Sequence, residues 1–121
     1  MSASFDHVGI NVSDYEKAKK FYAAALKPLD ITAMADFGVT VGLGEDRPFL
    51  WISEGTPGHV HLAFAAKNRK AVDAFYAAAI KAGGKDNGKP GLRTEYSANY
   101  YAAFVHDADG HNIEVVCHAP E

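Results

Sequence analysis

The sequence predicts an α+β fold built from two copies of one strand–helix–strand unit. The first observation is a repeat, since FYAAALK at residues 21–27 returns as FYAAAIK at residues 75–81. The second is that the register extends backwards: HVGINVSDYEKAKKFYAAALK from His7 aligns with HLAFAAKNRKAVDAFYAAAIK from His61. The third is that each block begins with a strand-like stretch and continues into a helical one. A match of this length and spacing indicates an internal duplication.

The turn-rich stretch EGTPG at residues 54–58 predicts the boundary between the two copies. We therefore expect one domain over residues 1–121, made of a first module at 1–57 and a second module at 58–121. A chain of this length has the ordinary size of a single domain and can bury roughly two-thirds of its unfolded surface.

The first module is expected to open with a strand and to continue into a helix. Residues 7–12 alternate between apolar side chains and polar or small ones, which is the period of a half-buried strand. Ser13 followed by Glu16 predicts a capping box at the start of the helix. The helical spacing gives this segment an apolar stripe formed by Ala18, Phe21, Tyr22 and Ala25. Further strands are expected at residues 37–43 and 48–53, separated by the turn-like GEDR.

The second module repeats this order. Asn68 predicts the start of its helix, and the pair Gly83-Gly84 predicts the end. Its apolar stripe is expected at Val72, Phe75, Tyr76, Ala79 and Ile80. Residues 83–91, GGKDNGKPG, are rich in glycine and lysine and predict a surface loop, with a lid over a site as the alternative. The last strands are expected at residues 100–107 and 112–118, joined by a turn at DADG.

Two histidines and one glutamate are the candidate metal ligands. The apolar even-numbered residues of each opening strand are expected to face the helix, which leaves His7 and His61 on the opposite face of the sheet. In the last strand Glu114 lies between Ile113 and Val115, where a carboxylate is costly unless it is paired or ligated. Two imidazoles and one carboxylate on a sheet face form a set typical of Fe(II) and acceptable to Mn(II), Zn(II) or Ni(II).

Each of these side chains also has an ordinary structural interpretation. A histidine in a strand is more often structural than a ligand, and Glu114 could pair with a lysine or arginine. The equivalent positions of His7 and His61 in the two copies favour the metal site. His59 lies on the same face of its strand as His61, but the repeat favours His61.

Composition excludes several classes of function. A net charge of −3 and a pI near 6.0 argue against a nucleic-acid-binding protein, which would normally carry a clustered basic face. The apolar stretches are far shorter than the roughly 18–20 residues that cross a bilayer, and the first residues lack the pattern of a signal peptide. One cysteine, Cys117, excludes an internal disulfide. We expect a cytoplasmic protein that binds neither nucleic acid nor membrane.

Three stretches resemble the vicinal oxygen chelate superfamily: DHVGINVSDYEKAKKFYAAAL, then HLAF with AFYAAAIKAGG, then FVHDADGHNIEVV. That superfamily includes glyoxalase I, extradiol dioxygenases, fosfomycin-resistance transferases and bleomycin-resistance proteins. The resemblance covers nearly the whole chain, and DADGHNIE is its most specific motif. It implies tandem βαβββ modules whose curved mixed sheets enclose a metal-centred cavity, frequently at a dimer interface. We therefore expect a homodimer.

The resemblance assigns the metal ligands to His7, His61 and Glu114. The fourth ligand of glyoxalase I would fall on Leu50 or Trp51, and neither side chain can bind a metal. Three protein ligands would leave positions open for oxygens of the substrate, as in the extradiol dioxygenases and the fosfomycin-resistance enzymes.

The sequence departs from both of those enzymes. The tyrosine that the dioxygenases place ten residues before the glutamate falls on Phe104, and a serine of the fosfomycin-resistance enzymes falls on Ala102. The resemblance therefore supports the metal chemistry of the superfamily and neither of these particular reactions.

We expect a metalloenzyme whose divalent metal, iron, manganese, zinc or nickel, acts as a Lewis acid on vicinal oxygens of a small molecule. Dioxygenase-like chemistry is favoured over four-ligand glyoxalase I chemistry. One alternative is a metal-free protein that binds a small molecule or antibiotic; another is a metal-dependent lyase or epimerase that uses water or Glu54 as a further ligand. Asn11, Trp51 and Tyr101 are expected to contact the substrate, and Tyr100 and Tyr101 are the candidates for a catalytic phenol.

Overall fold

The structure, a computed structural model, describes residues 5–120 and confirms the α+β fold with two similar modules. The elements of the first module are β1 (Val8–Val12), α1 (Tyr15–Leu26), the short 3₁₀ helix η1 (Lys27–Leu29), β2 (Thr32–Asp36), β3 (Thr40–Gly44) and β4 (Pro48–Glu54). Those of the second are β5 (His61–Ala65), α2 (Arg69–Lys81), β6 (Lys85–Leu92), β7 (Tyr101–His106) and β8 (Asn112–Cys117).

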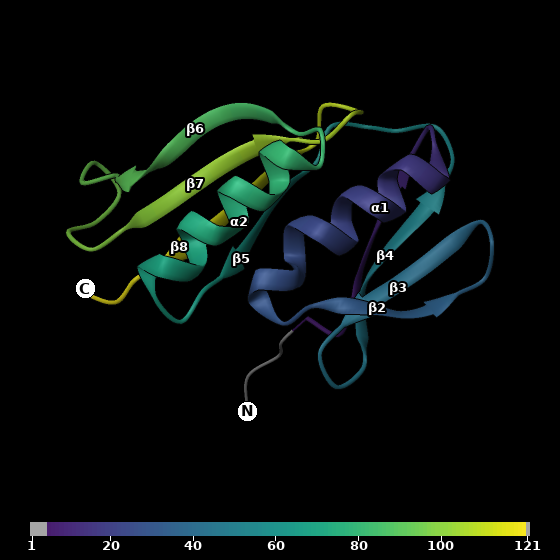
Figure 1. Cartoon of the computed structure of the whole chain (residues 1–121), viewed down its shortest axis with the longest axis horizontal. Coiled ribbons are helices and arrows are strands. Elements are labelled where there is room, and N and C mark those ends of the chain that lie inside the picture. The colour runs from purple at the N-terminus through teal and green to yellow at the C-terminus, as the bar shows by residue number, and fades with distance from the viewer. Residues whose placement is uncertain (1–4, 121) are drawn as a thin grey trace.

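Each module forms its own four-stranded mixed sheet (Figure 1). The strand orders are β1-β4-β3-β2 and β5-β8-β7-β6, so each opening strand lies at an edge beside the last strand of its module. That pairing is parallel in both sheets, and the other pairings are antiparallel. The duplicated sequence therefore folds into two sheets of the same topology.

The helices begin and end for local reasons. The stripe expected in the first helix is buried, and the side chain of Asn68 caps α2 by accepting a hydrogen bond from the Ala71 amide at 2.8 Å. The cap expected at Ser13 is wrong, because Asp14 caps α1 and accepts from the Lys17 amide at 3.1 Å. Ser13 instead donates its hydroxyl to Asp109 of the second module at 2.6 Å. The Ser13 hydroxyl therefore forms a contact between the two modules and does not cap the helix.

Three other expectations differ from the structure. Residues 83–91 were expected to form a loop, but most of them lie in β6, which pairs with β7 through two irregularities in register. Strand β2 lies before the stretch where the sequence predicts the first strand after α1. Ile80 is 37% exposed, so it is outside the buried stripe of α2.

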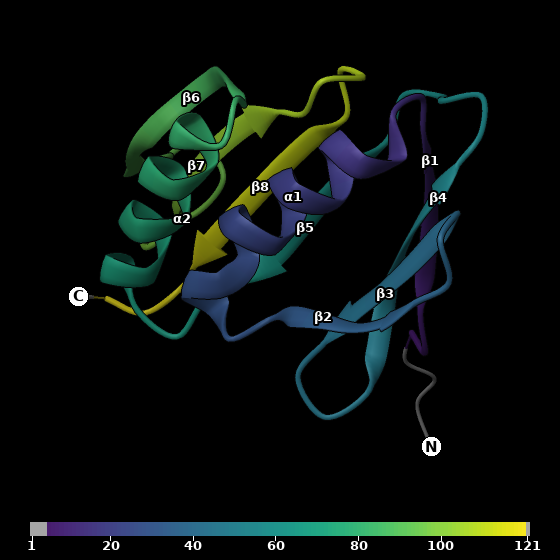
Figure 2. The same cartoon turned by 45° about the vertical axis from the view of Figure 1, so that its right-hand side comes forward.

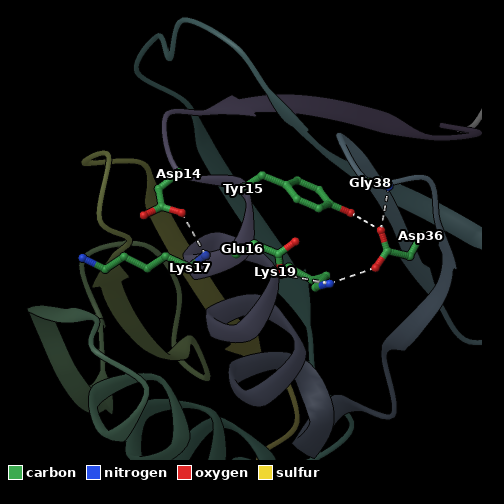
Figure 3. A network of polar contacts seen from close by, with 7 residues as sticks. All are labelled: Asp14, Tyr15, Glu16, Lys17, Lys19, Asp36 and Gly38. Atoms are coloured by element: carbon green, nitrogen blue, oxygen red, sulfur yellow. Dashed lines mark hydrogen bonds and ion pairs between the residues drawn. The ribbon is translucent and has the colours of Figure 1, made fainter.

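Asp36 at the end of β2 fastens that strand to the first turns of α1 (Figure 3). Its carboxylate accepts hydrogen bonds from the Tyr15 hydroxyl, from the Lys19 ammonium at 2.9 Å and from the Gly38 amide at 3.0 Å. These donors, led by Tyr15, hold the pKa of Asp36 well below its ordinary value of 3.8.

The two modules share one hydrophobic core. The helices α1 and α2 pack against each other, and the buried apolar residues of both modules form a single cluster. Figure 2 shows α1 between the two sheets, with β1 and β4 on one side and β5 and β8 behind it. Alternate residues on the other face of the sheets, such as Asn11 in β1 and Ala63 in β5, are exposed. The helices therefore cover one face of each sheet and leave the other uncovered.

A buried histidine connects the modules. His111 is fully buried, accepts a hydrogen bond from the Val60 amide on Nδ1 at 3.2 Å and contacts the carbonyl oxygen of Asn11 in β1 through Nε2 at 2.8 Å. Since Nδ1 accepts, Nε2 carries the proton and donates to Asn11. His111 therefore has a structural role between the modules.

Candidate metal and substrate site

Glu114 and His61 meet on the uncovered face of the second sheet. The strands that carry them, β8 and β5, are parallel neighbours, and Glu114 pairs with Ala63 in their register. His61 Nε2 lies 2.8 Å from Glu114 Oε1. Glu114 is only 3% exposed, so the hydrogen bond from His61 offsets part of the cost of burying its carboxylate.

Tyr100 occupies the other oxygen of this carboxylate. It lies directly before β7 and donates its hydroxyl to Glu114 Oε2. That hydrogen bond, together with burial, raises the pKa of Tyr100 to about 12. The phenol is therefore protonated at neutral pH, so it acts as a hydrogen-bond donor that fixes Glu114 and is unsuited to the role of a general base.

Two asparagines orient the His61 ring. Asn112 Nδ2 lies 3.1 Å from His61 Nδ1, while Asn112 Oδ1 accepts a hydrogen bond from the Asn87 amide at 3.1 Å. With Asn112 in this orientation its Nδ2 donates to Nδ1 of His61, and Nε2 carries the imidazole proton. His61 thus donates a hydrogen bond from Nε2 to Glu114.

The spacing of the His61–Glu114 pair suits a shared metal ion. Two cis ligand atoms, each about 2.1 Å from one metal, lie roughly 3 Å apart. The 2.8 Å between His61 Nε2 and Glu114 Oε1 is close to that value. To bind a metal through Nε2, His61 would carry its proton on Nδ1, and a turned Asn112 amide would accept it. These two residues therefore fit two positions of the expected ligand set.

His7 lies just before β1. In the described chain it does not form a compact cluster with His61 and Glu114. Its side chain is 60% exposed, and Nδ1 contacts Asp6 at 2.7 Å. A groove of about 410 Å³ between the edges of the two sheets is lined by both His7 and His61, and Glu114 is absent from its lining. Within residues 5–120, no three His, Cys, Asp or Glu side chains lie together so as to hold a metal ion.

Comparison with known proteins decides the family. The model of the Glyoxalase/Bleomycin resistance protein/Dioxygenase superfamily matches residues 4–115, nearly the whole chain. The chain belongs to this superfamily. A glyoxalase/bleomycin resistance protein from Albidiferax ferrireducens T118 is similar at 31% identity, with a TM-score of 0.81 over 95% of this chain and 98% of that one. No curated protein sequence matches.

Other solved structures share the fold at lower identity. A glyoxalase/bleomycin resistance protein/dioxygenase family enzyme from Burkholderia phytofirmans PsJN is 17% identical, with a TM-score of 0.76 over 97% of this chain and all of that one (100%). Lactoylglutathione lyase from Agrobacterium tumefaciens is 15% identical, with a TM-score of 0.70 over 96% and 94% of the two chains. The superfamily thus includes enzymes.

Neither of the two positions expected for the fourth ligand of glyoxalase I holds a metal-binding side chain. Leu50 is fully buried in the core, whereas Trp51 lies on the uncovered face of the first sheet, where its ring stacks on Phe37 with 6.2 Å between centroids. Glu54 is exposed at the end of β4. Trp51 and Phe37 therefore form an aromatic surface on this face of the first sheet.

The phenol near Glu114 comes from an unexpected position. Phe104, where the superfamily's dioxygenases carry a tyrosine, pairs directly with Glu114 across β7 and β8, and it has no hydroxyl. Tyr100, four residues earlier in the chain, supplies the hydroxyl instead. Ala102, which replaces a serine of the fosfomycin-resistance enzymes, is fully buried opposite Val116.

The three residues expected to contact the substrate do not lie on the same side of the sheets. Asn11 and Trp51 both lie on the uncovered face of the first sheet, and their contact with a substrate stays a prediction. Tyr101 faces the other way, because its hydroxyl donates to Asp73 of α2 at 2.6 Å and its ring packs against Arg69. Tyr101 therefore lies outside the site of this chain.

Three residues that the sequence pattern does not single out lie around His61: Arg93, Asn87 and Asn112. With Phe104, Tyr96 and other residues they line a cavity of about 480 Å³ beside the His61–Glu114 pair. They come from β6, β8 and the connection before β7, so their proximity depends on strand pairing. Residues 83–91, which include Asn87, gave only a loop signal.

Proposed function

We propose that this protein is a metalloenzyme in which His61 and Glu114 of one chain and the partner's His7 hold a divalent metal. The observation that carries the proposal is the His61–Glu114 pair, with the carboxylate buried and its second oxygen fixed by Tyr100. When bound, the metal would supply Lewis acidity toward two neighbouring oxygens of a small substrate.

Two neighbouring residues orient the candidate ligands: Tyr100 orients Glu114, and Asn112 orients His61. Tyr100 holds Glu114 Oε2, so Oε1 is the oxygen that remains for the metal. Asn112 contacts Nδ1 and so orients the His61 ring with Nε2 toward Oε1. Because the Glu114 carboxylate is held before anything binds, little of its conformational entropy is lost on binding.

A second copy is the source of the third ligand in this proposal. The helices of the two modules pack against each other, so the uncovered faces of both sheets need another chain to enclose them. An exposed apolar side chain, Phe37 at 68% exposed, lies at the uncovered face of the first sheet, where it stacks on Trp51. Removing such surface from water favours association, and His7 is exposed and accessible to a partner.

Three protein ligands favour a reaction in which the substrate supplies further oxygens. With Trp51 at the position of the fourth ligand, four-ligand glyoxalase I chemistry is disfavoured and dioxygenase-like coordination is preferred. The aromatic wall formed by Trp51 and Phe37 suits a substrate with an apolar portion.

One observation favours a second candidate, a metal-free small-molecule-binding protein. His61 and Glu114 satisfy each other through a direct hydrogen bond, so the pair is stable without a metal. In that case the same cavity would bind its ligand through polar and aromatic contacts alone.

Metal content of protein purified without chelator separates the two candidates. We expect about one metal ion per chain in the wild type and loss of affinity by about 100-fold or more in Glu114→Ala, His61→Ala and His7→Ala. His59→Ala is the matched control, because this exposed histidine lies two residues before His61 and should leave the metal content unchanged. Wild-type protein that binds none of iron, manganese, zinc or nickel would overturn the enzyme proposal in favour of the binding protein.

A further inference from the structure

We propose that Arg93 makes the cavity beside the His61–Glu114 pair a receptor for the carboxylate of a small organic acid. The inference deepens the proposed function by naming the substrate class, and it rests on that proposal only in placing the substrate at this cavity. The cavity of about 480 Å³ is lined by His61, Asn87, Gly88, Arg93, Glu95, Tyr96, Phe104 and Asn112.

The guanidinium of Arg93 is held in place before any ligand binds. It lies over the Phe104 ring with 5.4 Å from Cζ to the centroid, and Nη2 donates to the carbonyl oxygen of Lys89 at 2.7 Å. Phe104 is the residue that pairs with Glu114, so this stacking fixes the guanidinium next to the candidate metal ligands. An arginine held in this way loses less entropy when it binds an anion.

The glycines of β6 make room for this arrangement. A Cβ at Gly88 would lie 2.9 Å from Phe104 Cδ1 and 3.1 Å from Arg93 Nη2, and one at Gly91 would lie 3.1 Å from Arg93 Nη1. Side chains at these positions would displace the guanidinium. The glycine-rich composition that predicted a loop therefore has a second explanation: it leaves space for Arg93 on the strand.

The charge of Arg93 has no carboxylate partner in the described part of the chain. Arg47 pairs with Asp6 at 3.1 Å, and Lys89 pairs with Asp86 at 3.1 Å. The ion pairs over residues 5–120 include none formed by Arg93, although it is partly buried. A partly buried guanidinium with free N–H groups is the group that binds carboxylates in a bidentate geometry.

The remaining lining residues favour a singly charged acid with an apolar body. Arg93 is accompanied in the lining by Glu95, whose negative charge disfavours a doubly charged phosphate. Tyr96 is 63% exposed and packs edge-on against Tyr100 with 5.0 Å between centroids, so it offers an aromatic surface to the ligand. A carboxylate on an aromatic or aliphatic body matches both features.

The test uses benzoate and its neutral isostere benzamide as probes, with full-length, chelator-treated protein labelled with ¹⁵N. We expect saturable shifts of the Gly88 and Gly91 amides and of the Arg93 side chain with benzoate, and binding about tenfold or more weaker with benzamide. Arg93→Gln should weaken benzoate binding to the same extent, and Arg93→Lys should retain part of it. Arg69→Gln is the matched control, since Arg69 also stacks on an aromatic ring, Tyr101, but lies on the helix side of the sheet.

Equal binding of benzoate to wild type and to Arg93→Gln, with unchanged folding by circular dichroism, would overturn the inference. So would equal affinity for benzoate and benzamide, or an absence of binding to the wild type at millimolar concentration. The benzoate titration is done without metal, so its result does not depend on the metal proposal. If Arg93→Gln still binds metal but no longer binds benzoate, the carboxylate site and the metal site are separate.

Discussion

At the scale of single residues, the candidate site depends on how one buried carboxylate is satisfied. Glu114 receives one hydrogen bond on each oxygen, from His61 and from Tyr100. The sequence alone predicts that Glu114 faces away from the helix, because it alternates with Ile113 and Val115. It cannot predict the partners, because Tyr100 and His61 reach the carboxylate from two other strands or their ends. Asn112 is adjacent to Ile113 in sequence, yet its role toward His61 depends on the register of β5 and β8.

The first prediction concerns the proton on Tyr100. Its pKa is raised to about 12 chiefly by the hydrogen bond to Glu114. In Glu114→Gln the neutral amide removes the charged acceptor, so the pKa of Tyr100 should fall toward the ordinary value of 10.0. Titration of ¹³C-labelled tyrosine rings by NMR would measure this. Tyr76, whose pKa is raised by burial and by Asp86, is the internal reference and should not change. An unchanged Tyr100 pKa in the variant would contradict the assigned contact.

At the scale of elements, helices were easier to predict from the sequence than strands. The stripe of α1 and the Asn68 cap follow from helical periodicity and cap chemistry, which are local. Strand β6 was mistaken for a loop because Gly88 and Gly91 are usual loop residues, whereas here they accommodate Arg93 and Phe104. Ser13 was mistaken for a cap because its bond to Asp109 crosses between the modules.

The contact between α1 and β2 gives a prediction about pH. The donors around Asp36 lower its pKa below the ordinary value of 3.8, so the folded state favours the charged form (Figure 3). The resulting stabilisation is present above about pH 3.8 and is lost as the pH falls from there toward the lowered folded pKa. Asp36→Asn should therefore lower the melting temperature at neutral pH, and the gap to the wild type should narrow below about pH 3.8.

The control for this pH series is Asp30→Asn, an exposed aspartate at the end of η1. Its substitution should give no gap that depends on pH in the same way. A gap between Asp36→Asn and the wild type that stays constant from neutral to acidic pH would show that the hydrogen bonds of Asp36 do not favour its ionised form.

At the scale of the whole molecule, the duplication explains the arrangement of the candidate ligands. Each copy places a histidine at the start of an edge strand, His7 at β1 and His61 at β5, and the helices pack together on one side of the sheets. The repeat in the sequence was enough to predict both modules and the equivalence of the histidines. The repeat could not predict that α1 and α2 pack against each other. The helix faces that make this contact would be apolar whether they covered only their own sheet or also each other.

This arrangement is the reason to assign the third ligand to a second chain. Across the described residues, the structure shows no helix that is long and apolar enough to cross a membrane. Phe37 is exposed on the uncovered face of the first sheet, and a homodimer would bring the first sheet of one copy toward the second sheet of the other.

The most direct test of the account is the metal content of a mixture of His7→Ala and Glu114→Ala chains, refolded together to form mixed dimers. Each variant alone should bind no metal. A mixed dimer keeps His7 from one chain and His61 with Glu114 from the other, so the account predicts that metal returns at about one ion per mixed dimer. Metal binding by the wild type with none in the mixture would contradict the account and place all three ligands in a single chain.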